Sequence, residues 1–430
     1  MMKHYTCRLP EARSVILTGA ACCLGQLPAL ANPSGGTVGQ GSAFISSSGS
    51  QLTINQTSAS AFINWNSFNI NQGETTTFNQ PSASSVTWNY ISDPNASILN
   101  GNLNANGYVI LQNQNGFEVG GSAVINTHGL VMTTASSPNL DLSSGGSWAF
   151  AAPPPTAKIV NYGQINITGG GTAYLIASDI ENNGTITAPN GKIGLYAGQQ
   201  VLVSMSPDGR GLSAQVTLPQ GSVDNNGKLI ADAGTIAASA QFLNQNGLVQ
   251  ANSVQNVNGT IELVASDSLN LGANSVITAK GDSTGASAGG SVTIKSANNF
   301  ADQAGSVIDV SGGAQGGNGG QAEISAPNMG SFNSHVSGQA ADGFADGVVT
   351  IDPANVYLTT TGAAKNGYTS IAFSSFSGAS INVMADQNIE IGGLWTLANS
   401  SASALLTLIA GNNISFDNSA GITAGNNWGV

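Results

Sequence analysis

The sequence is 430 residues long, but only 7% of its residues are charged and 56 are glycine. A chain of this length ordinarily forms two or three compact domains, and a helical protein would need far more Glu, Lys, Ala and Leu. The hydrophobic 41% falls in patterned runs in which Val and Ile are prominent, which argues against disorder. Composition therefore favours an elongated all-β protein.

The formal net charge is -12. An acidic surface repels phosphate backbones, so the charge argues against nucleic acid as a partner. The sequence also lacks a polybasic segment that would favour anionic lipid. Cys7, Cys22 and Cys23 all lie in the first 31 residues. The rest of the chain has no cysteine, so its stability is expected to come from packing and hydrogen bonds without disulfides.

Residues 1–31 have the three parts of a secretory signal peptide. Their apolar run is too short to remain as a membrane anchor. Cleavage is predicted after Ala31, and Cys22 leaves a lipoprotein signal open as the alternative. The three parts are a basic segment at residues 3–13, an apolar segment at residues 14–25, and an A-x-A site at residues 29–31.

Residues 32–70 alternate Gly/Ser corners with short strands and end in a segment with two aromatic residues. Trp65 and Phe68 are three apart in a stretch that otherwise alternates, so the two rings are not expected to play the same part. The first coil of a β-solenoid exposes an open backbone edge and an apolar end. We therefore expect one of these rings to cap the core while the other faces into it.

Residues 107–134 show the pattern of strands and turns most clearly. The segments "YVILQ" and "AVIN" are rich in β-branched and aromatic residues, and Asn115-Gly116 supplies positive φ at a corner. The segment is therefore predicted to form a strand, a sharp turn and a second strand. Because the same pattern returns until the chain ends, the sequence is that of a repeat protein.

Residues 136–158 interrupt this rhythm. The three consecutive prolines at residues 153–155 cannot donate hydrogen bonds to a strand ladder. The segment is therefore predicted to leave the coil as an extra-helical loop or short hairpin that carries Trp148 and Phe150. Two roles stay open for these aromatic residues. They bind a partner, or they pack back over the solenoid, which is the commoner outcome.

After Lys158, two interleaved glycine repeats become explicit. The first has steps of 21, 43 and 20 residues, which we interpret as one, two and one turns. At about twenty residues per turn and ~4.8 Å per coil, the mature chain would form roughly twenty coils and a rod on the order of 90 Å long. The second repeat starts strands that alternate apolar and polar residues. These strands are expected to stack as a parallel ladder, with aliphatic residues inside and Thr, Ser, Asn and Gln ladders outside. The first repeat has Gly163, Gly184, Gly227 and Gly247, and the second has Gly171, Gly191, Gly234, Gly259, Gly290 and Gly320.

Catalysis is disfavoured by the scatter of the acidic residues. A β-helical polysaccharide-active enzyme needs acidic or basic groups clustered on one outer face. The nearest pairs are Asp179 with Glu181 and Asp224 with Asp232, and both adjoin Asn-Gly turns where a solvated acid is common. His128 lacks neighbouring histidines for a metal cluster. The sequence therefore predicts no enzyme, no metal site and no cofactor.

Four segments in fixed order carry a family resemblance: "INWNSFNI", "TTTFNQPSASSVTWNYI", "NANGYVILQNQNGFEVG" and "INTHGLVMTT". Together with the leader, they make the chain resemble the N-terminal secretion domain of filamentous haemagglutinin-like exoproteins, the cargo of bacterial two-partner secretion. The resemblance is dense over residues 32–188 and looser to residue 430. It implies a right-handed parallel β-helix, or β-solenoid, with an N-terminal cap and extra-helical loops or hairpins.

The family's Asn-Pro-Asn-Gly-Ile signature falls on Asn113, Gln114, Asn115, Gly116 and Phe117. Glutamine replaces the proline and phenylalanine replaces the isoleucine, whereas the asparagines and the glycine that shape the turn remain. The resemblance implies that this corner is the motif for secretion and transporter recognition. It also implies a division into a signal peptide at residues 1–31, a secretion or haemagglutination-activity domain at residues 32–275, and β-helical stalk repeats at residues 276–430.

The partners implied by the resemblance are the general secretory translocase, an outer-membrane transporter with periplasmic polypeptide-binding domains, and an unknown surface receptor, either glycan or protein. The cargo would cross the periplasm, leave the cell unfolded and fold at the outer surface of a Gram-negative bacterium. There it would act as a secreted or cell-surface adhesin in cell adhesion and virulence. Two alternatives stay open: the delivery stalk of a contact-dependent toxin, and an autotransporter, whose C-terminal barrel is not recognisable in residues 350–430.

Overall fold

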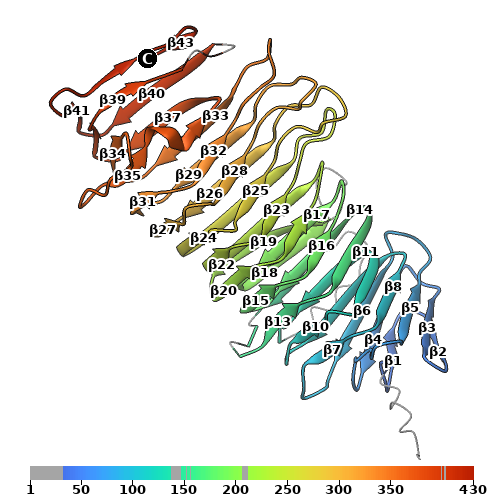
Figure 1. The fold of residues 1–430 in the computed structure, drawn as a ribbon. Coiled ribbons are helices and arrows are strands. Elements are labelled where there is room, and N and C mark those ends of the chain that lie inside the picture. Colours follow the sequence, from blue (N-terminus) through green and yellow to red (C-terminus); the bar gives the residue numbers. More distant parts are fainter. Residues whose placement is uncertain are drawn as a thin grey trace, which may run out of the picture.

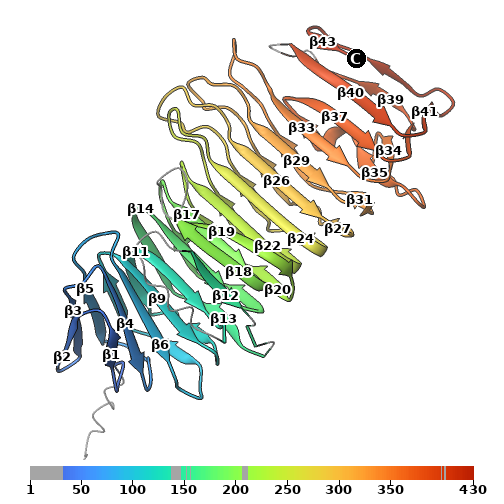
Figure 2. The same ribbon diagram turned by 180° about the vertical axis from the view of Figure 1, so that it is seen from behind.

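The computed structural model describes residues 32–136, 147–151, 153–154, 156–205, 212–398, 400 and 403–430. The predicted signal peptide and its cleavage after Ala31 lie outside the described residues, as do Pro155 and part of the segment before Trp148. The described chain winds into a rod of stacked coils that runs from the N-terminal strands to the C-terminus (Figures 1 and 2). Most strands pair in parallel with the equivalent strand of the next coil, so the fold is the predicted parallel β-helix.

Each coil contributes strands to three walls, which we name wall A, wall B and wall C in the order in which the chain meets them. Wall A contains β3 (Gln51–Gln56), β5 (Thr75–Asn79), β8 (Asn102–Ala105), the first parts of β11 (Val124–Thr133) and β14 (Gln164–Ile176), β16 (Thr185–Thr187), β21 (Lys228–Ile230), β23 (Leu248–Gln250), β25 (Val276–Thr278), β28 (Val307–Asp309), β32 (His335–Ser337) and β36 (Phe376–Ser377). The pair β39 (Leu394–Thr396) and β42 (Gly421–Thr423) follows as a separate sheet.

Wall B contains β4 (Ser60–Trp65), β6 (Val86–Ile91), β9 (Tyr108–Asn113), the second parts of β11 and β14, β17 (Lys192–Tyr196), the first parts of β22 (Thr235–Gln245) and β24 (Thr260–Leu271), β26 (Ser291–Ser296), β29 (Gln321–Ser325), β33 (Gly347–Asp352), β37 (Ala379–Ala385), β40 (Ala404–Ala410) and β43 (Trp428–Gly429).

Wall C contains β7 (Ser97–Leu99), β10 (Phe117–Val119), β13 (Lys158–Asn161), β15 (Asp179–Asn182), β20 (Ser222–Asn225), the second parts of β22 and β24, β27 (Asn299–Asp302) and β30 (Asn328–Met329). It continues through β31 (Ser331–Phe332), β35 (Thr369–Ala372), β34 (Asn355–Thr359), β38 (Asn388–Ile391) and β41 (Asn413–Phe416). The 3-10 turn Phe373–Ser375 follows β35, and among the described residues no helix is long and apolar enough to span a membrane.

The core is a continuous stack of aliphatic side chains between the walls. In wall B, residues in register on successive strands present the same inward position, so each side chain packs on its equivalent one coil away. All of them are buried, and in the later coils alternation along the strand leaves polar neighbours such as Thr293 outside. The predicted inward aliphatic stacks are therefore present. One such column is Leu195, Ala238, Leu263, Ile294 and Ile324.

The repeat glycines stack at the corners because the coils approach too closely for a side chain. A Cβ atom on Gly227 would lie 2.1 Å from the carbonyl oxygen of Gly184, and one on Gly247 would lie 2.1 Å from that of Gly227. The 43-residue step between Gly184 and Gly227 is nevertheless one coil, because Thr185 pairs directly with Lys228. The prediction of two turns there was wrong, since the additional residues fold outward as a hairpin.

The number of coils was also overestimated. In the described part of the chain, wall B has fourteen strands from β4 to β43, which at ~4.8 Å per coil gives a rod of about 60 Å. The prediction of about twenty coils and 90 Å was wrong for two reasons. Two coils carry excursions, and later coils are longer than twenty residues. Glu262, for example, pairs with Thr293, which lies 31 residues further along.

The excursions form an antiparallel sheet outside the β-helix, which we name the outer sheet. It consists of β12 (Trp148–Ala151), β18 (Gly198–Met205) and β19 (Leu212–Pro219). Trp148 and Phe150 are buried against the outer face of wall B and approach Trp88 at 6.3 and 5.6 Å between ring centroids. Of the two roles left open for these aromatic residues, packing over the solenoid is therefore the one observed.

Antiparallel strands lie at the N-terminal end of the rod. Strand β1 (Thr37–Gln40) pairs with β4, and β2 (Ala43–Ser48) pairs with β3. Trp65 and Phe68 are both buried and meet edge to face, with ring centroids 5.5 Å apart. The indole nitrogen of Trp65 donates to Asn89 Oδ1 at 2.9 Å. Both candidate cap residues therefore lie buried in the first coils, beside the antiparallel strands, and the assignment of one ring to the cap stays a prediction.

Side-chain amides form ladders on both sides of the coil wall. The predicted outer ladder is present, since Asn166 donates to Asn126 and Asn126 donates to Asn104. A second ladder lies inside the corner between walls C and A, where its members are buried. The sequence predicted amide ladders only on the outside of the coil. The side-chain amides of Asn161, Asn182 and Asn225 each donate to the side chain one coil further on, over 2.7 to 2.8 Å, and the ladder ends at Gln245.

Candidate functional site

The corner between β9 and β10 contains all five residues of the candidate motif, and we name it the 113 corner. Asn113 ends β9, and its side-chain Oδ1 accepts a hydrogen bond from the backbone N–H of Asn115 at 2.9 Å. Gly116 has a φ of 103°, a conformation that favours glycine, and its N–H donates to the Asn113 carbonyl at 3.1 Å. Phe117 is buried and begins β10. The sharp turn predicted from Asn115-Gly116 is therefore present as an Asx-turn.

Hydrogen bonds tie the 113 corner to the corner of the preceding coil. The amide group of Asn113 donates to the Asn95 carbonyl and to Ser97 Oγ, both at 3.0 Å. The amide group of Asn115 donates to the Asp93 carbonyl at 2.7 Å. The two asparagines kept from the family signature therefore act as a clamp between two coils, in addition to shaping their own turn.

The preceding corner, residues 93–97, repeats the same local structure, and we name it the 93 corner. Asp93 Oδ1 accepts from the backbone N–H of Asn95 at 2.9 Å, as Asn113 does for Asn115. Strand pairing places Ser97 opposite Phe117. In the sequence, Asp93-Pro94-Asn95 is a signal for a turn. Both corners have the pattern Asx-X-Asn just before a three-residue strand. This shared pattern is the sequence signal that could have identified the 93 corner as a related structure.

The following coil closes the 113 corner from the other side. A Cβ atom on Gly116 would lie 2.5 Å from the carbonyl oxygen of Lys158, so a larger residue has no room there. Gln114 donates its side-chain amide to the Ser136 carbonyl. In the folded chain Asn113, Gly116 and Phe117 are buried, Gln114 is half-buried and only Asn115 is exposed. The folded corner therefore presents little of its sequence to another molecule.

The residues weighed for catalysis have structural partners. The ring of His128 lies edge to face on Tyr108, with centroids 5.3 Å apart, and burial raises the pKa of the Tyr108 phenol. Within the described residues, no group of three or more His, Cys, Asp or Glu side chains could hold a metal ion. The four acids accept hydrogen bonds along the coil walls: Asp179 from Ser222, Glu181 from Asn183, Asp224 from Asn244, and Asp232 from Gln250 and Asn252.

These features define a class: a parallel β-helix with antiparallel strands at its N-terminal end, an outer antiparallel sheet and stacked Asx corners. The family model of the TPS secretion domain, the two-partner secretion domain, matches residues 29–282 of this sequence. The chain belongs to this family. Its members are exported through the periplasm with an outer-membrane transporter as the partner.

Two curated relatives are both described as heme/hemopexin-binding protein of Haemophilus influenzae. The first, from strain Rd, is 32% identical over 249 residues, which are 55% of this chain and 27% of the relative. The second is 27% identical over 242 residues, which are 50% of this chain and 26% of the relative. The matched part is therefore about a quarter of the length of these relatives.

The same fold is found in the crystal structure of the HMW1 secretion domain from Haemophilus influenzae. The two structures superpose with a TM-score of 0.65 at 22% sequence identity, covering 90% of this chain and 99% of the other. At this identity the likeness establishes the parallel β-helix and leaves individual residues without an assigned role.

Proposed function

We propose that the protein is an adhesin-like exoprotein whose N-terminal coils are bound by the outer-membrane transporter while the chain is unfolded, and which folds into a rod at the cell surface. The observation that supports this order of events is the burial of the 113 corner. A transporter in the periplasm can read Asn113, Gly116 and Phe117 only before folding, because folding buries all three. Folding outside the cell would then remove the motif from the transporter and prevent return.

The physical properties of the chain suit export in an unfolded state. The sequence after residue 31 has no cysteine that could cross-link it in the periplasm. Contacts in a solenoid join neighbouring coils, so coils can form one after another as they emerge. At ~0.05–0.15 kcal/mol per residue, about 400 residues would supply very roughly 20–60 kcal/mol of folding free energy to favour outward transit.

The export role is tested by deleting residues 32–135 from the full precursor and expressing it with its transporter. We expect the truncated chain to remain in the periplasm. The matched control lacks residues 321–430 and keeps both corners, so it should still reach the medium or the cell surface. Normal secretion of the chain without residues 32–135 would refute the targeting role. An adjacent reading frame for a barrel with periplasmic polypeptide-binding domains would identify the transporter to use.

The 113 corner is tested separately by changing Asn115 and Gly116 together to Ala. Export should slow, and the secreted fraction should lose protease resistance, because the clamp to Asp93 is lost and Ala is strained at the positive φ of residue 116. The matched control changes Gly121 to Ala in the next turn. Gly121 is exposed, and a Cβ atom on it would meet nothing within 4 Å. Unchanged secretion and protease resistance in the first variant would show that the corner is passive.

Adhesion is the function proposed for the finished rod, because its polar, asparagine-rich wall offers many weak contacts that multivalency can add together. A second candidate is binding of haem or a haem-carrying protein, which is favoured by the names of the two Haemophilus relatives. A delivery stalk for a contact-dependent toxin would share the same export route. Binding of the secreted rod to host cells, hemopexin or target bacteria distinguishes the three.

A further inference from the structure

Wall C is split near the C-terminal end by an additional strand. Strand β35 inserts between β31 and β34, pairing with Ser331–Phe332 on one side and with β34 on the other. Just before this point the two coils still touch, because the Ala354 N–H donates to the Pro327 carbonyl at 3.2 Å. Two strand spacings, ~9.6 Å, therefore separate coils that were one spacing apart a few residues earlier. The wall opens as a wedge.

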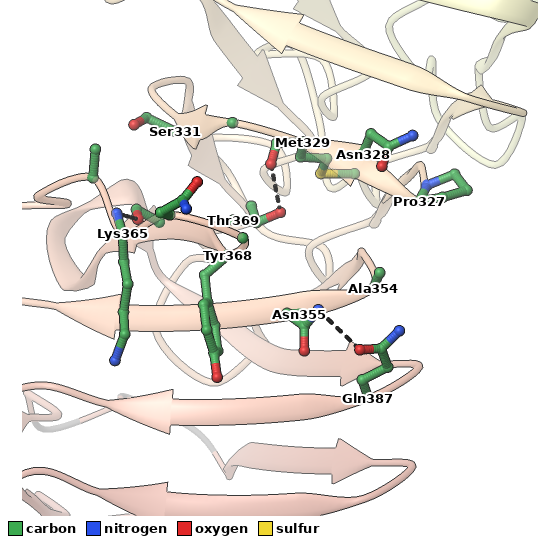
Figure 3. A pocket seen from close by; sticks show the side chains of 15 residues that line it. Pro327, Asn328, Met329, Ser331, Ala354, Asn355, Lys365, Tyr368, Thr369 and Gln387 are labelled. Carbon is green, nitrogen blue, oxygen red and sulfur yellow. Dashed lines mark hydrogen bonds between the residues drawn. The ribbon is translucent and has the colours of Figure 1, made fainter.

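A groove of about 720 Å³ occupies this wedge (Figure 3), and we name it the wedge groove. Its volume lies within the ~300–1,000 Å³ typical of sites for small molecules. One edge is formed by residues 327–331, the other by Ala354, Asn355 and Gln387, and the loop before β35 forms its end. The wedge closes at Pro327, where the hydrogen bond from Ala354 joins the two coils.

An aromatic ring is held in position at the end of the groove. Lys365 and Tyr368 come from the same loop and lie side by side in Figure 3. The Lys365 ammonium lies 5.0 Å from the centre of the Tyr368 ring and 4.5 Å from that of Tyr357. It also binds the Glu390 carboxylate. Among the described residues, Lys365 is the one charged residue that lines the groove. Because its charge is paired, the groove has no free cation to attract an anionic ligand.

A third ladder of side-chain amides runs along the start of wall C and is interrupted at the groove. Asn328 donates to Asn298 at 2.9 Å on one side of the gap, and Asn388 donates to Asn355 at 3.0 Å on the other. The Asn355 amide turns to Gln387 Oε1 at 3.3 Å. Among the described residues, Asn328 Oδ1 and the amide nitrogen of Gln387 have no hydrogen-bond partner. The gap therefore presents one acceptor and one donor beside an aromatic ring.

We propose that the wedge groove binds a neutral sugar unit of a glycan. A sugar ring has a face of C–H groups that packs on an aromatic ring, and hydroxyl groups that both donate and accept. Tyr368 supplies the ring, Gln387 the donor and Asn328 the acceptor. The paired charge of Lys365 disfavours acidic sugars. For the adhesive rod proposed above, this site would mean that the receptor is a glycan. Only this biological role rests on the proposed function, and sugar binding itself does not.

The test is saturation-transfer NMR and titration of the purified mature chain with maltose, lactose and chitobiose as neutral probes. The same chain is titrated with 3′-sialyllactose as an acidic sugar and with a Thr-Val hexapeptide as a strand. We expect at least one neutral disaccharide to bind with millimolar affinity and to receive magnetisation from aromatic protons. Because binding is measured on purified protein, it succeeds or fails independently of export and of transporter recognition.

Variants locate the binding site. Tyr368→Ala should weaken the sugar about tenfold and Gln387→Ala several-fold, whereas Tyr368→Phe should keep the affinity within about threefold, because the ring remains. Tyr162→Ala is the matched control, since Tyr162 is exposed on a distant coil and its loss should leave affinity unchanged. If Tyr368→Ala does not fold, Gln387→Ala decides the question. Failure of all three neutral sugars to bind, preference for sialyllactose or the peptide, or affinity unaffected by Gln387→Ala would overturn the proposal.

Discussion

One position on the outer face of wall B has opposite character in the two halves of the rod. Strand register places the same outward site on each successive coil. In the N-terminal half it is aromatic or aliphatic, and the outer sheet covers it. In the C-terminal half it is polar and faces solvent. The residues are Phe62, Trp88, Ile110, Val131 and Tyr174 in the first half, and Glu262, Thr293, Glu323, Thr350 and Asn382 in the second.

The difference shows that coils with the same backbone fold can be stabilised by different sets of side-chain contacts. The N-terminal coils have a second apolar cluster outside the wall, including Trp148 and Phe150 from the outer sheet, as well as the core within it. The described residues of the C-terminal coils contribute to the inner core and not to this outer cluster, and these coils carry longer corners. Because each coil of a solenoid contacts mainly its neighbours, stability is expected to be local and greater in the first half.

The largest expected effect comes from removing the ring at the centre of the outer cluster. Trp88 is fully buried, contacts Trp148 and Phe150, and donates to Gln112 Oε1 at 2.8 Å. Trp88→Ala should cost about 3–5 kcal/mol of local stability. Hydrogen exchange resolved along the chain should show faster exchange in β6, β9 and the outer sheet.

The matched variant for the other half is Phe332→Ala. Phe332 is buried between Phe300 and Phe376, with 6.3 Å between centroids on each side. The Phe332→Ala substitution should speed hydrogen exchange in the C-terminal coils and leave exchange in the outer sheet slow. If either variant accelerated exchange equally in both halves, the rod would unfold as one cooperative unit and the comparison would fail.

The second effect concerns the glycine corners, which are shared by both halves. Gly227→Ala places a Cβ atom 2.1 Å from the Gly184 carbonyl oxygen, so the coils must separate at this corner. We expect a loss of about 1–3 kcal/mol, measured by urea unfolding. Gly121→Ala is the control and should change stability by less than about 0.5 kcal/mol, since its Cβ atom would enter open space. Equal effects would mean that close approach of the coils does not select these glycines.

The third effect separates the buried amide ladder from the half-buried outer one. Asn182→Ala leaves the Asn161 amide without its acceptor and Asn225 Oδ1 without its donor, both in buried positions. It should cost about 1–3 kcal/mol. Asn126→Ala breaks the outer ladder, where water can replace the lost partners, and should cost less than about 1 kcal/mol. The two urea midpoints decide this, and an equal loss would contradict the distinction.

Much of this fold could be predicted from the sequence because its rules are local. Alternation identified the strands that follow Gly259 and Gly290, and an Asn-Gly pair identified the 113 corner. Two features depended on contacts that are remote in sequence. A 43-residue step fits two short coils as well as one coil with a hairpin, and only the pairing of Thr185 with Lys228 distinguishes them. The wedge groove likewise exists because β35 pairs out of chain order.

The outer cluster had a weak signal that the sequence interpretation passed over. The segment "YVILQ" is apolar at consecutive positions, whereas "SVTIKS" alternates. A continuous apolar run is typical of a strand buried on both faces, and β9 is buried along its whole length. What covers the second face could not be predicted, because the outer sheet is assembled from segments on either side of two full coils.

The smallest expected effect is a dependence on pH that is confined to the C-terminal half. Burial raises the pKa of the Asp302 carboxyl, although the backbone N–H groups of Asn333 and Ser334 donate to it at 2.9 and 2.6 Å. The folded chain therefore holds this proton more tightly than the unfolded chain does. The stabilising contribution of protonation is fully present below the unfolded pKa, and it is lost as pH rises through the folded pKa. Acidification from pH 7 should stabilise β27 and the coil next to it.

Asp302→Asn should remove this pH dependence and change local stability at pH 7 by less than about 1 kcal/mol, because an amide oxygen can still accept both N–H groups. Asp282 supplies a control of opposite sign. Hydrogen bonds from Thr284 lower its pKa, so its contribution is present above the unfolded pKa and lost as pH falls through the folded pKa. The matched variant is Asp282→Asn. Hydrogen exchange at pH 7 and pH 4.5, corrected for intrinsic rates, should show that the two substitutions change the pH dependence of local stability in opposite directions. A shift in the same direction would mean that desolvation does not govern Asp302, and that the longer C-terminal coils admit more water around this carboxyl than its burial indicates.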